Sequence, residues 1–308
     1  MNTVLRTPDS CFEGLEDYPF QANYLQVSGN DADLRMHYVD EGPTDAHPIL
    51  MLHGEPSWSY LYRKMVPILA EAGYRAIAPD HIGFGKSDKL SHVEDYSYQK
   101  HVDWIQELII TLNLKNITLV MQDWGGPIGL REVALDPERF SRLVVANTLL
   151  PNCEQFPRGI ANWPSEEIRQ WIAFSALTPD LPVGDIMQGS TVSELSPSVV
   201  AAYNAPFPDA SYKAATQAFP ALIPIEENMA GCAENIEAWE ILDQWTKPFL
   251  TAFSDGDPST KPWEQIFQQR IPGAKMQSHA TIEKAGHFLQ EDQGERLAQT
   301  IIQFINNT

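Results

Sequence analysis

The chain has 308 residues, of which 43% are hydrophobic, and carries a formal net charge of −20. This length suits a single large domain with an insertion, and the apolar fraction is ample for a buried core. The strong negative charge disfavours nucleic acids and anionic membrane surfaces as partners, because both would be repelled. No apolar run approaches the roughly 18 residues of a membrane span, and no signal-like segment opens the chain. We therefore expect a soluble, cytoplasmic protein.

The cysteines give a further expectation. Cys11, Cys153 and Cys232 are an odd number of residues at wide spacing. This pattern predicts neither a disulfide framework nor a metal site. It fits a reducing compartment.

Strands and helices alternate through the first half of the chain. Alternating apolar residues predict a half-buried strand over 33–42, and short apolar runs predict strands over 47–54, 75–80, 117–122 and 142–148. Helical spacing occupies 60–72, 96–114 and the stretch from Gly126 onward. Because the strands are apolar almost throughout, we predict an α/β fold with a mostly parallel sheet covered on both faces.

The pattern changes near Leu149. Residues 151–224 are rich in proline and aromatic residues and suggest short helices without a clear strand. Alternation resumes with predicted strands in 248–257 and 278–287 and an amphipathic helix over 294–307. We predict a core domain of residues 1–150 and 225–308, interrupted by a helical cap domain of residues 151–224.

The stretch LVMQDWGGPIGL, residues 119–130, joins a strand abruptly to a helix. Such a turn lifts one side chain above the sheet and leaves the next backbone N–H free, as in the G-x-S-x-G motif of serine hydrolases. Here the central residue is Asp123, followed by Trp124, and Met121 replaces the usual first small residue. Asp123 is thus a candidate nucleophile, with helix capping as the alternative.

Candidate partners follow in the order expected for this fold, which is nucleophile, acid and then histidine. His287 lies between the last predicted strand and the last predicted helix, where the base is expected. Asp255 and Asp257 both follow the preceding strand. We favour Asp257 as the acid because it stands just before the proline of the loop, and we interpret Asp255 as a turn former.

A third motif, His53-Gly54-Glu55, directly follows a predicted strand and resembles an oxyanion-hole turn. The backbone N–H groups of Glu55 and Trp124 would hold a developing oxyanion. The Glu55 side chain could also position a water, or it could be a partly exposed loop carboxylate.

We call this strand-to-helix turn at Asp123 the elbow. An aspartate at the elbow favours displacement at saturated carbon. A carboxylate is already ionised at neutral pH, and its attack gives an ester, which a water activated by His287 would open. Alkyl halides and epoxides are the substrates that suit this chemistry. An epoxide oxygen needs a proton donor, usually tyrosine, whereas a halide needs only weak donors such as the indole N–H of Trp124.

The motifs HGEPSWSYLYR, QDWGGPIGLR, YNAPFPDASY and EKAGHFLQED resemble the haloalkane dehalogenases, in particular a subgroup with Glu after His-Gly. The resemblance covers nearly the whole chain. It implies an α/β-hydrolase fold and the hydrolysis of a haloalkane to a primary alcohol, halide and a proton through an alkyl-aspartyl ester. It implies Asp123 as nucleophile, His287 as base and Asp257 as supporting acid.

The resemblance also implies a halide site and a set of partners. Trp124 would bind the halide with a second tryptophan from the cap, for which Trp171 and Trp163 compete. We favour Trp171, because W-x-x-F-S followed by a proline turn resembles the cap helix of the family. The implied partners are a haloalkane, water and halide, with no cofactor or metal. We expect a detoxifying enzyme that is a monomer or a weak homodimer.

Alternatives remain for the cap and for the activity. Phe174, Phe207 and Phe219 are predicted to line the pocket, unless they are ordinary cap core. An epoxide hydrolase, the nearest rival, would use Tyr203 and Tyr212 as acids. A fluoroacetate dehalogenase would need arginines beside the nucleophile, and Arg131 lies two helical turns away. A non-catalytic binding module is a further alternative, which an intact nucleophile, acid and base disfavour.

Overall fold

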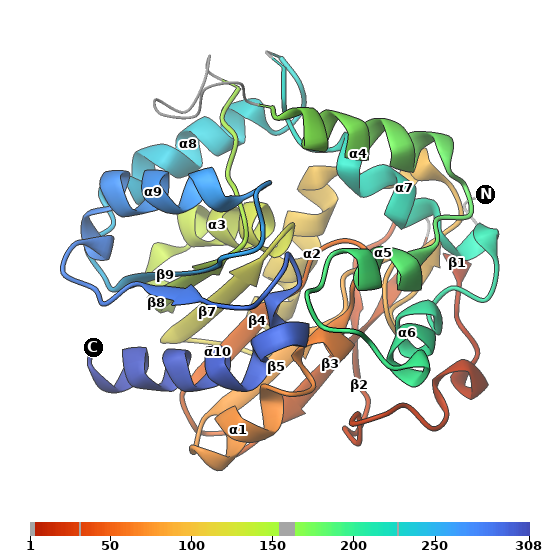
Figure 1. The fold of residues 1–308 in the computed structure, drawn as a ribbon, viewed down its shortest axis with the longest axis horizontal. Coiled ribbons are helices and arrows are strands. Elements are labelled where there is room, and N and C mark those ends of the chain that lie inside the picture. The colour runs from red at the N-terminus through yellow and green to blue at the C-terminus, as the bar shows by residue number, and fades with distance from the viewer. Residues whose placement is uncertain (1–3, 31, 154–163, 227) are drawn as a thin grey trace.

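The computed structural model describes residues 4–30, 32–153, 164–226 and 228–308, and within them an eight-stranded sheet forms the centre of the fold (Figure 1). The strands follow the spatial order β10-β9-β8-β7-β4-β5-β3-β2. They are β2 (Asn23–Val27), β3 (Leu34–Glu41), β4 (Pro48–Leu52), β5 (Arg75–Pro79), β7 (Ile117–Gln122), β8 (Phe140–Ala146), β9 (Phe249–Ser254) and β10 (Ala280–Ile282). A separate antiparallel pair joins β1 (Val4–Leu5) to β6 (Lys89–Leu90).

The sheet is parallel from β10 to β5, and at the other edge β3 pairs antiparallel with both β5 and β2. Every residue of β4, β7 and β9 is buried, as expected for inner parallel strands covered on both faces. Leu52 of β4 pairs with Met121 of β7, and Gln122 pairs with Ala146 of β8, so the carboxyl ends of these strands meet at one edge. The predicted α/β fold with a mostly parallel sheet is confirmed.

Helices cover both faces of the sheet (Figure 1). One face carries α2 (Tyr98–Thr111), α3 (Gly125–Leu135), α8 (Cys232–Leu242) and α9 (Lys261–Arg270), and the other carries α1 (Val66–Glu71) and α10 (Leu289–Asn306). On the first face, Trp239 of α8 stacks on Phe267 of α9 with ring centroids 5.7 Å apart. On the second face, α10 packs on α1, β9 and β10.

The remaining α-helices of the described residues form a group beside the sheet, on the right of Figure 1. They are α4 (Glu166–Leu177), α5 (Val183–Gly189), α6 (Pro197–Asn204) and α7 (Ala214–Ala221). α4 packs on α7, and α5 packs on α6. Within 164–226 the described residues contain no strand, in line with the short helices expected there. The domain boundaries at 150 and 225 stay a prediction.

The expectation that the cysteines form no disulfide is wrong. Cys153 and Cys232 are bonded, with Cα atoms 5.6 Å apart and a sequence separation of 79. Cys153 follows β8 and Cys232 begins α8, so the bond joins the two ends of the segment that carries α4–α7. Spacing along the chain concealed this pair, because only the fold brings the segment's ends together. The inference of a reducing compartment therefore loses its basis. Among the described residues, no helix is both long and apolar enough to span a bilayer.

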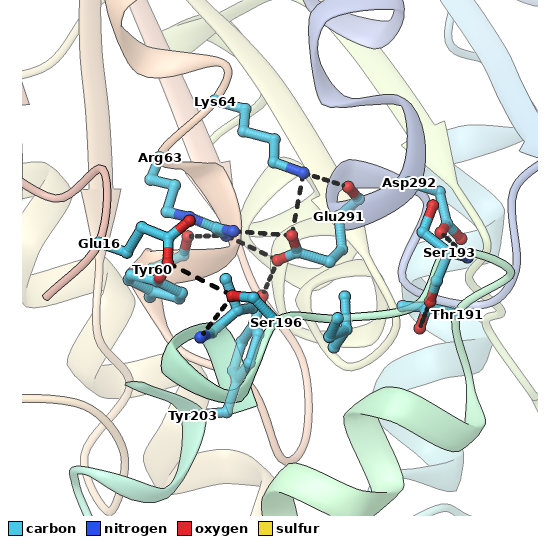
Figure 2. A network of polar contacts seen from close by, with 12 residues as sticks. Glu16, Tyr60, Arg63, Lys64, Thr191, Ser193, Ser196, Tyr203, Glu291 and Asp292 are labelled. Carbon is cyan, nitrogen blue, oxygen red and sulfur yellow. Dashed lines mark hydrogen bonds and ion pairs between the residues drawn. The ribbon is translucent and has the colours of Figure 1, made fainter. Parts of the chain in front are cut away.

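A buried ion pair fastens α6 to the core (Figure 2). Arg63 forms two hydrogen bonds to Glu291, at 2.6 and 2.7 Å, and both side chains are only 1% exposed. Tyr203 of α6 donates its hydroxyl to the same carboxylate at 2.7 Å. Burial disfavours the ionised form of Glu291, but the bonds and charge of Arg63 outweigh it and lower the pKa of Glu291 to about 2.

Replacing Glu291 by glutamine should destabilise the protein, because Arg63 would be left buried without its counter-charge. We expect the free energy of unfolding at neutral pH to fall by about 3–5 kcal/mol, measured by urea denaturation. The folded-state pKa of Glu291 is depressed from 4.5 to about 2, so this stabilisation is complete above the unfolded value and is lost as the pH falls toward about 2.

Two variants serve as controls for this measurement. Tyr203→Phe removes one hydrogen bond to a charged group and should cost about 2 kcal/mol. Glu295→Gln changes the same charge on an exposed position of α10 and should cost less than about 0.5 kcal/mol. Equal, small losses for Glu291→Gln and Glu295→Gln would contradict a stabilising role of the buried pair.

Candidate active site

The turn between β7 and α3 fixes Asp123 in an unusual backbone conformation. Its φ is 49°, in the left-handed region that few residues other than glycine adopt. A Cβ added at Gly125 would lie 2.1 Å from the Leu52 carbonyl oxygen, and one at Gly126 would lie 1.8 Å from Thr148 Oγ1. Only glycines therefore allow α3 to start this close to β4 and β8. Asp123 is lifted above the end of the sheet as a result.

The carboxylate of Asp123 is held by backbone and not by α3. Its Oδ1 accepts a hydrogen bond of 2.8 Å from the Glu55 N–H. A Cβ at Gly54 would lie 2.0 Å from the same oxygen, so the turn after β4 must contain glycine there. The N-cap of α3 is Trp124, and no side chain of the described residues caps this helix. The capping alternative for Asp123 is therefore wrong.

The side chain of Glu55 is buried beside the nucleophile candidate. It is 4% exposed, and among the described residues neither of its carboxyl oxygens has a hydrogen-bond partner. Burial, and then the negative charge of Asp123, raise the pKa of Glu55 well above its usual range. The interpretation as a partly exposed loop carboxylate is wrong. The raised pKa favours the protonated form of Glu55, which can both donate and accept a hydrogen bond.

His287 lies between two carboxylates. Its Nδ1 is 2.8 Å from Asp257 Oδ2, and its Nε2 is 3.4 Å from Asp123 Oδ2. Burial favours the neutral ring, but the charge of Asp257 and the interactions with Asp123 outweigh this and raise the pKa of His287 to about 10. The raised pKa favours the imidazolium form of His287, which lies between the carboxylates of Asp123 and Asp257.

The two acid candidates have different partners. Besides His287, Asp257 accepts bonds from the hydroxyl groups of Ser259 and Thr260, each at 2.5 Å. Burial disfavours its charge, but the attraction of His287 and these bonds hold the pKa of Asp257 well below its usual range. Asp255 instead accepts the backbone N–H groups of Lys284 and Ala285, at 3.1 and 3.2 Å. Of the two, Asp257 is the carboxylate that contacts the histidine.

Two amides that the sequence analysis did not single out hold the backbone of His287. Gln122, at the end of β7, donates to the His287 carbonyl at 3.2 Å, and its Nε2 lies 3.1 Å from His287 Nε2. Asn147, just after β8, donates to the carbonyl groups of Gly286 and His287 at 2.9 and 3.0 Å. Both are polar residues at the carboxyl end of a buried strand, which is the signal that could have identified them.

A cavity of about 390 Å³ opens above Asp123, between the sheet and the helices α4 and α5. Its lining includes Asp123, His287 and Asp257 together with the apolar side chains Trp124, Leu149, Ile168, Trp171, Ile186, Val192, Ile223 and Phe288. Neither Trp124 nor Trp171 donates its indole N–H to another described residue, so both donors are available to a ligand. The competing Trp163 lies outside the described residues.

The three phenylalanines predicted to line the pocket do not line it. Phe174 is 45% exposed on α4, and Phe207 and Phe219 are buried against Phe84. Phe219 also packs edge-on against Trp124, with ring centroids 5.2 Å apart. Phe219 therefore packs against a cavity residue without lining the cavity itself. The packing of the cap on the core decides which face of each helix meets the cavity.

Residues required by the rival activities also lie elsewhere. Tyr203 is fully buried with Glu291, Tyr212 is half-buried, and neither lines the cavity. Arg131 lies over the ring of Tyr98, 4.6 Å from its centroid, and is likewise absent from the lining. No group of His, Cys, Asp or Glu in the described part of the chain has an arrangement suited to a metal ion.

Comparisons with known proteins agree with this geometry. The family model described as alpha/beta hydrolase fold matches residues 47–293. A haloalkane dehalogenase of Psychrobacter cryohalolentis is 52% identical over 99% of this chain and 98% of its own length, and one of Mycolicibacterium paratuberculosis is 50% identical over 97% of each chain. The tetrameric haloalkane dehalogenase of Paraglaciecola agarilytica superposes with a TM-score of 0.87, at 36% identity and 97% coverage of each chain. This chain therefore belongs to the haloalkane dehalogenases, hydrolases that act on carbon–halide bonds within the alpha/beta hydrolase fold.

Proposed function

We propose that this haloalkane dehalogenase works through a covalent ester on Asp123. The observation that carries the proposal is the setting of this carboxylate. One oxygen is held at 2.8 Å by the Glu55 N–H, and the other lies 3.4 Å from His287, at an apolar cavity. An Asp123 oxygen attacks the saturated carbon in line, so that the C–O bond forms while the carbon–halogen bond breaks and the halide leaves with the bonding electrons.

Alkylation prepares the second step by removing the negative charge of Asp123. The interaction with Asp123 is among those that raise the pKa of His287, so His287 loses its proton to solvent more readily in the alkyl-enzyme. Neutral His287 then takes a proton from a water as it attacks the carboxyl carbon, and Asp257 holds the ring in the tautomer with its proton on Nδ1. Collapse of the intermediate breaks the bond between the carboxyl carbon and the alkoxy oxygen, which takes the remaining proton of the added water, so that the alcohol leaves and Asp123 is restored as a carboxylate.

Three further groups complete the proposed site. The oxyanion of the intermediate is held by the N–H groups of Glu55 and Trp124, each worth about 3–4 kcal/mol. The Trp124 N–H donates to no group among the described residues, so it is available to the oxyanion. The protonated side chain of Glu55 can orient the attacking water, and because it is neutral it does not repel the departing halide. The halide would be bound by the indole N–H groups of Trp124 and Trp171.

The alternatives lack supporting residues around the cavity. Epoxide opening would need an acidic tyrosine there, and Tyr203 instead donates to Glu291. Haloacid binding would need a cation near Asp123, and no lysine or arginine of the described residues lines the cavity. A non-catalytic binding module would not need a nucleophile and an acid that both lie within 3.4 Å of the base.

Beyond the mechanism, we propose residues 151–224 as a cap over a core of residues 1–150 and 225–308. We also propose a detoxifying role in the cytoplasm without a cofactor, as a monomer or a weak homodimer, although the relative from Paraglaciecola agarilytica is tetrameric. Thiol reductants in such a compartment would act on the Cys153–Cys232 bond.

Asp123→Ala should abolish bromide release from 1-bromobutane or 1,2-dibromoethane, because Asp123 is the only carboxylate among the described cavity residues that the Glu55 N–H holds. His287→Phe should release one bromide per active site and then stop, with the chain heavier by one butyl group in mass spectrometry. Asp255→Asn is the control and should turn over normally. Repeated turnover by Asp123→Ala would contradict the mechanism, and diol from styrene oxide without bromide release would favour the epoxide hydrolase.

The pH dependence of kcat should report the pKa of His287 in the alkyl-enzyme. The base must be neutral, so kcat should rise with pH through that pKa, which lies below the value of about 10 in the resting site because Asp123 has lost its charge. Asp257→Asn should move this rising limb of the kcat–pH profile to lower pH and lower the maximal rate by about 10²-fold or more. Asp255→Asn should leave the limb in place, and an equal shift in both variants would exclude Asp257 as the specific acid.

Trp171→Phe should weaken halide binding, because the phenyl ring lacks the indole N–H. A hydrogen bond to an anion is worth about 1.5–3 kcal/mol, so we expect the Kd for bromide to rise by about tenfold or more. Quenching of tryptophan fluorescence by bromide measures this. Phe174→Leu on the same helix controls for disturbance of α4, since Phe174 does not line the cavity. Unchanged bromide affinity in Trp171→Phe would remove Trp171 from the halide site.

A further inference from the structure

The carboxylate of Asp292 joins the cap to the turn that carries His287. Its Oδ2 accepts the N–H of Gly286 at 2.8 Å and the N–H of Val192 at 3.0 Å. Its Oδ1 accepts the N–H of Ser193 at 2.7 Å. Hydrogen bonds to an ionised carboxylate are about twice as strong as neutral ones, so three of them hold these segments firmly.

Both segments belong to the site. Val192 lines the cavity from the loop after α5, and Gly286 lines it directly before His287. The loop lies directly on the turn, because a Cβ at Gly286 would be 2.4 Å from the Ser190 carbonyl oxygen. The direct backbone bond between them, from the Phe288 N–H to that carbonyl, is long at 3.4 Å. The short bonds between the loop and α10 are therefore those to Asp292.

The shape of α10 makes this contact possible. Its first turn, from Leu289 to Asp292, is followed by a kink at Gln293, which has the non-helical angles φ −140° and ψ 39°. The kink separates the first turn from the rest of the helix. Asp292, the last residue of the first turn, accepts the N–H groups of Gly286 and of the cap loop of residues 190–193, as Figure 2 shows for Ser193.

We propose that Asp292 is a positioning residue that aligns His287 for hydrolysis of the alkyl ester, by holding the loop of residues 190–193 against the turn at Gly286. The inference rests on the proposed function. It applies to the second step, because Asp123 is aligned separately for displacement by the elbow and by the Glu55 N–H. Loss of Asp292 should therefore slow ester hydrolysis and spare halide release in the first turnover.

Rapid-quench measurement of bromide released from 1-bromobutane separates the two steps. Asp292→Ala should show a burst of one bromide per folded active site, followed by a steady rate lower than that of the wild type by about tenfold or more. The alkyl-enzyme should accumulate and be visible by mass spectrometry. Glu295→Gln, which removes an exposed acidic charge from the same helix, should behave as the wild type.

Asp292→Asn provides a second test that keeps nearly the same shape. Its amide oxygen can still accept the N–H groups of Gly286 and Val192, while its NH₂ group would face the N–H of Ser193. We expect a full burst and a steady rate between those of Asp292→Ala and the wild type. A steady rate equal to that of the wild type, or below that of Asp292→Ala, would overturn the proposal.

The other outcomes are also decisive. If the burst and the steady rate of Asp292→Ala, each expressed per total protein, fall in the same proportion, the substitution has only lowered the fraction of folded enzyme. The proposal is then wrong. Unchanged kinetics in Asp292→Ala would also overturn it, while leaving the proposed function intact. Failure of the wild type to release bromide would instead overturn the proposed function, and the inference with it.

Discussion

The architecture of the site depends on a close approach of backbone segments behind one carboxylate. Asp123 has a left-handed φ of 49°, and the glycines after it are required because Leu52 and Thr148 leave no room for a Cβ. These contacts exist because β4, β7 and β8 are parallel neighbours whose carboxyl ends meet. The sheet order therefore creates the elbow, and the turn after β4 then supplies the Glu55 N–H to Asp123 Oδ1.

Electrostatic balance around His287 follows from this placement. Three carboxyl groups lie near one histidine, and ionisation of all three would give this buried site a larger negative charge than ionisation of two, which burial makes costly. The raised pKa of Glu55 favours its neutral form and so limits this charge, while the raised pKa of His287 favours an imidazolium between Asp123 and Asp257. On the proposed mechanism, the same balance makes alkylation of Asp123 the event that converts His287 from a counter-ion to a base.

Features carried by short motifs could be predicted from the sequence, and features that depend on packing could not. The elbow, the turn after His53 and the inner strands were predictable, because each is encoded within a few consecutive residues. The edge strand β2 was not predicted because it is short, with five residues of which only Leu25 and Val27 are buried. The Cys153–Cys232 bond and the burial of Phe219 behind Trp124 depend on contacts between distant segments, so no local pattern revealed them.

Two adjacent acids at the start of α10 link the cap to the base in different ways. Glu291 is buried with Arg63 and accepts the Tyr203 hydroxyl from α6, whereas Asp292 accepts backbone N–H groups from the cap loop and from the residue before His287. The attachment of α5 and α6 therefore passes through the same turn that follows the base. α4, which carries Trp171, packs instead on α7. On the proposed mechanism, substitutions that loosen α5 or α6 from this turn should thus affect ester hydrolysis, while loss of Trp171 from α4 should affect halide binding.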